Sequence, residues 1–205
     1  MSKQSPAVRF STIICLCLLV VIPPVDSAER HDDSKNIKAL AGRICLYYNM
    51  SGKNIARDAK KAIKKYMTKY EGIQHPTGKQ MLLFLNKNKH KMTCKRDGLE
   101  KNYMMVAFDR SAHNALFDGL LFSDLTPRDR KIKPDVNAVS YTGKNGIPET
   151  VLDYMNRIIA NKRNSRGFIK EVQNLKDTFV KHLDGKRFDQ LPAKEQARFN
   201  NVKPK

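Results

Sequence analysis

The side chains best placed to do chemistry in this sequence are two histidines and the charged residues beside one of them. His113 lies in the stretch VAFDRSAHNALFDGLL, close to Asp109 and Arg110, and His75 stands further upstream. Two histidines suffice for RNA cleavage, because one can accept the proton of the 2′-hydroxyl while the other donates a proton to the leaving oxygen. His75 and His113 are therefore the catalytic candidates. Nothing in the sequence brings the two together, and an isolated histidine in a turn is more often simply exposed.

Other catalytic and metal-binding patterns are absent from the sequence. There is no His-x-Glu-x-x-His, Cys-x-x-Cys or Gly-x-Ser-x-Gly motif, so zinc-enzyme and serine-hydrolase mechanisms have no support. The acidic residues in the middle of the chain fall on separate expected strands and turns, which favours structural or solvated roles over a metal site. These residues are Asp109, Asp118, Asp124 and Asp129. The sequence thus predicts neither a metal nor a cofactor.

The strong positive charge of the chain indicates an anionic partner. The formal net charge is +19 at pH 7, and the bases are most concentrated in residues 53–101. Such a field attracts RNA, DNA, sulfated glycans or anionic lipid headgroups, although charge alone specifies no partner and can serve solubility. The candidate nucleic-acid-binding residues are Arg57, Lys60, Lys61, Lys64, Lys87, Lys89 and Lys91. The aromatic residues that could stack on bases are Tyr47, Tyr48, Tyr103 and Phe117.

The N-terminus has the layout of a secretory signal peptide. Basic residues precede the apolar run of residues 11–22, and two prolines and a small-residue cleavage site follow it. The run is about 12 residues long, whereas a membrane span needs about 20. We therefore expect residues 1–27 to be removed, the mature chain to begin at Ala28, and the protein to be secreted without a stable membrane span.

The cysteines predict one covalent cross-link. Removal of the signal would leave only Cys45 and Cys94. In an oxidising compartment they are expected to form a disulfide, with two unpaired buried thiols as the alternative. Asn49 begins the only Asn-x-Ser/Thr sequon, which could carry a glycan in a eukaryotic host cell. Because the sequon is close to Cys45, folding could also block its modification.

The elements that must position these residues are predicted from periodicity and turn residues. Residues 28–42 are polar and indicate a loose N-terminal segment. The β-branched and aromatic residues of RICLYYN, residues 43–49, indicate a strand. Ser51 or Gly52 can then cap a helix that runs to about Tyr70, with Gly72 as its stop. This helix has an apolar side, expected to pack on a sheet, and a basic side.

The apolar runs that follow predict an antiparallel meander. Gly119 within one of them marks a bulge or a close backbone approach. The expected strands are residues 80–86, 91–95, 103–108 and 116–122. Residues 43–125 thus predict an α+β domain in which one helix packs on an antiparallel sheet. A basic amphipathic helix lying on a membrane surface is the alternative.

The C-terminal part of the chain changes character. Residues 126–147 are rich in turn formers and predict a linker or long loop, and residues 148–205 predict a basic helical extension. Apolar stripes indicate helices over residues 151–159 and 168–183. Ser165 is the candidate cap and Gly185 the candidate stop of the second helix, and Pro192 is expected to start a short third one.

The order of these elements resembles a known family. The segments ICLYYN, IARDAKKAI and YMMVAFDRSAHNALFDGLLFS resemble the fungal guanyl-preferring ribonuclease fold. More closely, they resemble the ribonuclease-like secreted effectors of powdery mildew fungi, over residues 43–125. In that alignment Met105 and Ser123 occupy the positions of the family's catalytic Arg and His. Neither can supply the cation or the proton transfer that RNA cleavage needs.

The resemblance implies a secreted, non-catalytic effector that binds host RNA or a host protein through its basic surface and could be translocated into a host cell. Two alternatives stay open. One is a divergent secreted ribonuclease that uses His75 and His113. The other is a secreted polyanion- or membrane-binding protein of a different fold.

Overall fold

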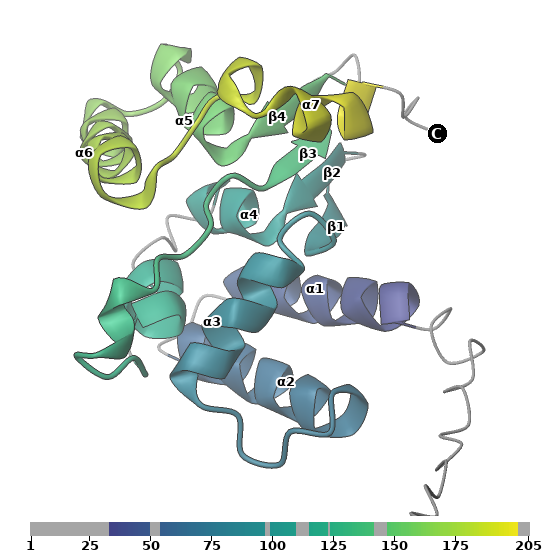
Figure 1. Cartoon of the computed structure of the whole chain (residues 1–205). Coiled ribbons are helices and arrows are strands. Elements are labelled where there is room, and N and C mark those ends of the chain that lie inside the picture. The colour runs from purple at the N-terminus through teal and green to yellow at the C-terminus, as the bar shows by residue number, and fades with distance from the viewer. Residues whose placement is uncertain are drawn as a thin grey trace, which may run out of the picture.

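The computed structural model describes residues 33–49, 54–96, 99–109, 115–122, 124–141 and 147–200, apart from the side chains of residues 33, 34, 49, 96, 117 and 118. The expected signal peptide, His113, Ser123 and the side chains of Asn49, Phe117 and Asp118 lie outside the described residues. The described chain is α+β and mostly helical, with two small antiparallel sheets (Figure 1).

Three helices form the N-terminal end of the molecule: α1 (Asp33–Asn49), α2 (Ile55–Tyr70) and α3 (Gly78–Lys87). They are the purple to blue elements of Figure 1, with α1 and α2 packed against each other. The middle of the apolar stripe of α2 is buried, namely Ala59, Ile63, Tyr66 and Met67. It faces helices rather than the sheet that the sequence predicts. Burying one such side chain stabilises the fold by roughly 1.5–3 kcal/mol.

The middle of the molecule holds both sheets and the most buried helix. Strands β1 (Thr93–Arg96) and β2 (Leu99–Asn102) form one antiparallel pair, and β3 (Val139–Tyr141) and β4 (Pro148–Thr150) form the other. Helix α4 (Tyr103–Asp109) contacts α1, β2 and α5, and its first six residues are all buried. The core is therefore built around α4.

The C-terminal end consists of α5 (Val151–Ala160), α6 (Arg166–Leu183) and α7 (Ala193–Asn200). The α5 and α6 helices pack against each other, and the ring of Phe179 lies 6.0 Å from that of Phe108 in α4. Three short helical turns complete the described chain: the π-helix η2 (Ala115–Phe122) and the 3-10 helices η3 (Asp129–Lys131) and η4 (Phe188–Gln190).

Several predicted elements are confirmed, because local signals specify them. Helix α2 ends before Gly72, which has a positive φ of 69°. The Ser165 hydroxyl accepts a hydrogen bond from the Phe168 N–H and begins α6, as predicted. Residues 93–96 form β1, α5 covers the first C-terminal stripe, and α7 starts after Pro192. Helix α6 ends at Leu183, but Asp184 rather than Gly185 takes the left-handed conformation, with φ of 52°.

Four predicted strands are wrong. Residues 43–49 belong to α1, residues 80–86 to α3, residues 103–108 to α4 and residues 116–122 to η2. Short apolar runs are compatible with a strand or with a buried helix, so periodicity alone does not separate them. In α3 the deciding local signal is a capping box, in which the Thr77 hydroxyl accepts from the Gln80 N–H and the Gln80 side chain accepts from the Thr77 N–H. The single helix on one sheet is therefore replaced by packed helices beside two small sheets.

The described parts of two segments expected to be loose contain regular structure. Residues 33–42 of the expected N-terminal segment form the first part of α1. The expected linker contributes η3, the strand β3 and the buried residues Val136 and Ala138. Gly119 does make a close approach, as predicted, but within a helix, because a Cβ at this position would overlap the Ala56 side chain of α2.

The disulfide between Cys45 and Cys94 is confirmed and joins α1 to β1. The two cysteines are 49 positions apart in the sequence, and the bond closes the loop between them. Within the ranges that the structure describes, no helix combines the length and the hydropathy needed to span a membrane.

Candidate polyanion interface

The basic residues predicted on α2 divide between two environments. Arg57 lies 3.5 Å from Asp58 of its own helix, whereas Lys60 and Lys64 lie near an acid that follows η2. The Lys60 ammonium donates to Asp124 at 2.7 Å, and Lys64 lies 4.0 Å from the same carboxylate. This flank is therefore partly neutralised. Lys61 is exposed and makes no ion pair with a described residue.

The second predicted group lies at the end of α3 and in the turn after it. Lys87 and Lys91 are exposed. Lys89 is different, because its side chain is only 14% exposed and its ammonium contacts Asp135 at 2.7 Å and Glu195 at 3.2 Å. The sequence thus placed Lys89 in a basic surface, but the fold uses it in an internal ion-pair cluster.

A groove between α1 and α2 brings together basic side chains that are not among the predicted nucleic-acid-binding residues. Small side chains on both helices, Ala39 and Ala62, leave a hollow of about 200 Å³ whose floor includes Leu40 and Tyr66. The rim carries Asn36, Arg43, Lys65, Lys69 and Tyr70. We call this hollow and its rim the α1–α2 groove. Its residues recur three or four positions apart on each helix, so they share one face.

The rim of the α1–α2 groove is positively charged and open. Arg43, Lys65 and Lys69 are exposed, and none of them is paired with an acid in the part of the chain that the structure describes. None of the described residues that line the groove is acidic. Cations beside an apolar floor interact with an anion more strongly than in open water, because the local dielectric is lower.

An aromatic series supports the groove from below. The ring centroids of Phe84 and Tyr66 are 5.3 Å apart, and those of Tyr66 and Tyr70 are 4.8 Å apart. Tyr70 is 40% exposed, and the Lys69 ammonium lies 4.8 Å from its ring centroid. The series runs from the core to the surface, so it holds an exposed ring against the groove. Such a ring can stack on a planar ligand.

The catalytic candidates are not brought together by the described residues. His75 is exposed in the segment between α2 and α3, and His113 lies outside the described residues. Met105 is 0% exposed in the centre of α4, so it cannot line a surface groove. Among the residues that the structure describes, no group of three or more acidic, histidine or cysteine side chains could hold a metal ion.

Two of the four predicted stacking aromatics are also inside the fold. Tyr48 and Tyr103 are buried, and burial raises the pKa of both phenols. Tyr47 is half-buried against the core, and the Phe117 side chain is outside the described residues. The exposed ring is Tyr70, which the sequence suggested only as part of the apolar stripe.

A buried polar cluster joins β2, α4 and α5. The Lys101 ammonium donates to Asp109 at 2.6 Å and to the Tyr154 hydroxyl at 3.2 Å, and that hydroxyl donates to Asp109. Burial and the Asp109 carboxylate raise the pKa of Tyr154, so its phenol stays protonated as a donor. All three groups satisfy one another, which makes the cluster a structural link between these elements.

The sequence contained part of the signal for the α1–α2 groove. Lys65 and Lys69 continue the four-residue spacing of Lys61 along α2. No such spacing indicated Arg43, because the sequence predicts a strand over residues 43–49 and not a helix that packs beside α2. No protein-family model, curated protein or solved structure among those compared matches the chain.

Proposed function

We propose that the protein binds single-stranded RNA in the α1–α2 groove without cleaving it. One observation carries the proposal: a single hollow combines three exposed basic side chains with an apolar floor, beside an exposed tyrosine ring. Phosphate groups would contact Arg43, Lys65 and Lys69, while one unpaired base enters the hollow and stacks on Tyr70.

The apolar floor favours an unpaired base over other polyanions. A sulfated glycan would use the three positive charges but has no planar group for the hollow. The bases of a duplex are stacked inside the helix and cannot enter it without unpairing. Charge therefore supports affinity for any polyanion, and the hollow supports selectivity for a single strand.

We further propose that this binding serves a secreted effector that acts on host RNA or on a host protein. This part rests on the resemblance to powdery mildew effectors and on the signal-like N-terminus. The mode of action would be capture rather than chemistry, because the described residues that line the α1–α2 groove include cations and an aromatic ring but no histidine or carboxylate that could transfer a proton. Incubation of the protein with RNA should therefore yield no cleavage.

The test is a triple variant, Arg43→Ala, Lys65→Ala and Lys69→Ala, titrated with a labelled single-stranded oligonucleotide at several salt concentrations. Loss of three phosphate contacts should reduce the slope of log K against log salt by about 2, because each contact with a single strand contributes about 0.7. The variant Tyr70→Ala should weaken binding of the oligonucleotide but leave heparin binding unchanged.

The matched control removes the same charge from α6 through Arg166→Ala, Lys170→Ala and Lys181→Ala, all at exposed positions. It should keep the slope of the unmodified protein. If both triple variants weaken binding equally, only the net charge matters and the groove is not the site. Equal loss of heparin and RNA binding in Tyr70→Ala would exclude the stacked base.

A further inference from the structure

Two donors in the turn after α3 converge on a single carboxylate oxygen. Glu195 Oε1 lies 3.2 Å from the Lys89 ammonium and 2.9 Å from His90 Nε2. The Val139 N–H donates to His90 Nδ1 at 3.1 Å, so Nε2 carries the ring hydrogen and donates it to Glu195. This pair of fixed donors around one anionic oxygen is the arrangement that a phosphate oxygen also requires.

The helix that supplies this carboxylate is held by few contacts. No residue of α7 is buried. Beyond Glu195, its attachments are the Gln196 amide, which donates to the carbonyls of Asp189 and Leu191 just before the helix, and the side chain and carbonyl of Phe199. The Phe199 ring lies 5.0 Å from His90 and 6.1 Å from Tyr141, and its carbonyl accepts from the Tyr141 hydroxyl at 2.9 Å. An isolated helix of this length is marginal in water, so its order depends on these contacts. Its release would leave the core closed.

We propose that Lys89 and His90 form an anion-binding site for a phosphate group, and that α7 occupies this site through Glu195 as an internal competitor. Asp135 contacts the Lys89 ammonium from another side, at 2.7 Å, and would keep it oriented when α7 leaves. Lys87 and Lys91 flank the site and are exposed, so they would attract the same ligand. The site is separate from the α1–α2 groove and does not depend on it.

The phosphate could belong to a free ion or to an RNA strand, and two measurements separate these sources. In the first, hydrogen exchange of the α7 amides is followed while inorganic phosphate is added to the full chain. Phosphate should accelerate this exchange, because it replaces Glu195, whereas sodium chloride at equal ionic strength should not. Equal acceleration by both salts would show that only charge screening loosens α7, and would overturn the proposal.

In the second measurement, the variant Glu195→Gln is titrated with the single-stranded oligonucleotide. Removal of the competitor should raise the affinity about fivefold or more, since the site is then free in most molecules. The control Asp177→Asn makes the same charge change at an exposed position on α6, and should alter affinity by at most about twofold.

A further pair of variants separates the site from net charge. Phe199→Ala loosens α7 without changing charge and should also raise the affinity. Adding Lys89→Gln to Glu195→Gln should remove the gain. If Glu195→Gln and Asp177→Asn change the oligonucleotide affinity equally while phosphate still accelerates exchange of the α7 amides, the ligand is a free phosphate. If phosphate also fails to accelerate the exchange beyond sodium chloride, or if Lys89→Gln leaves the gain intact, no such site exists. Failure of the groove variants described above would leave these results unaffected, so the two proposals can fail independently.

Discussion

The partners of individual basic side chains determine which of them are available to a ligand. Lys60 and Lys89 are both part of the basic pattern in the sequence, but Asp124 contacts one of them, and Asp135 and Glu195 contact the other. Arg43, Lys65 and Lys69 have no such partner among the described residues. Both ammonium groups are already held by these carboxylates, with side chains only 18% and 14% exposed, so they are less available to a ligand than the unpaired cations of the groove.

His90 makes stability depend on pH. Burial, and to a smaller extent the charge of Lys89, lower the pKa of His90, while Glu195 and Asp135 oppose this effect. A lowered pKa means that the folded state prefers the neutral ring. The neutral His90 ring makes its full contribution to the free energy of unfolding above the ordinary histidine pKa of about 6.5. This contribution is lost as the pH falls through the lowered pKa.

We therefore expect the free energy of unfolding to fall less between pH 7.5 and pH 5 in His90→Gln than in the unmodified protein. Urea titrations at each pH measure this difference. The control is His182→Gln, which removes an exposed histidine from α6. An identical pH dependence in the unmodified protein and in His90→Gln would contradict the assignment.

Close packing between elements restricts a glycine position on η2. Gly119 of η2 lies against Ala56 of α2, and a Cβ at residue 119 would overlap the Ala56 methyl group. The substitution Gly119→Ala should therefore destabilise the protein by about 1–3 kcal/mol, as overpacking does. Denaturant midpoints of unfolding measure the change.

A matched helical glycine provides the control for that experiment. Nothing lies within 4 Å of a Cβ built at Gly167 in the first turn of α6. Gly167→Ala should be neutral or stabilising by up to about 1 kcal/mol, because alanine favours the helix. In a double-mutant cycle, Ala56→Gly should recover part of the loss caused by Gly119→Ala. Without such coupling, the overlap would not be the cause.

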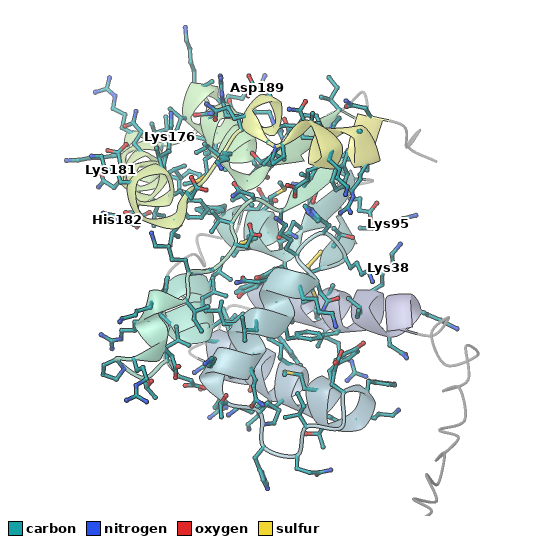
Figure 2. The ribbon with its side chains drawn as sticks, viewed as in Figure 1. Lys38, Lys95, Lys176, Lys181, His182 and Asp189 are labelled. Atoms are coloured by element: carbon teal, nitrogen blue, oxygen red, sulfur yellow. A yellow bond between two sulfur atoms is a disulfide. The ribbon has the colours of Figure 1, made fainter. Side chains whose placement is uncertain are left out.

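At the scale of the whole molecule, the positive charge is distributed over opposite sides. Figure 2 shows Lys38 and Lys95 projecting near α1 and β1, and Lys176, Lys181 and His182 projecting from α6 on the other side. With a net charge of +19, the molecule has a field that attracts polyanions from several directions. Specific binding must then come from a shaped site, such as the α1–α2 groove.

The single disulfide links the N-terminal helices to the central sheet. The separation of 49 residues between Cys45 and Cys94 implies that the cross-link stabilises the fold by about 4 kcal/mol in the chain-entropy model. The variant Cys45→Ala with Cys94→Ala should lose about that much in chemical denaturation. Reduction of the unmodified protein should give the same shift, and no shift in either case would show that the cross-link does not constrain the unfolded chain.

The sequence by itself determined the features that depend on local signals or on composition. The stop of α2 at Gly72, the Ser165 cap of α6, the stripe of α5 and the net charge are of this kind. The pairing of Cys45 with Cys94 also followed, because the expected signal removal left no other partner. Each of these features is specified by residues close together in the chain or by the cysteine count.

Only the tertiary structure decided between helix and strand where apolar runs are buried on several sides. Residues 103–108 are apolar throughout and carry no period, so the elements packed around them select the helix α4. Tertiary structure also decided which basic side chains are paired with acids. Lys60 and Asp124 are 64 positions apart in the sequence, and His90 and Glu195 are 105 positions apart. Neither pairing has a local signal. The α1–α2 groove, with Arg43 on one helix and Lys65 and Lys69 on the other, exists only once those two helices pack.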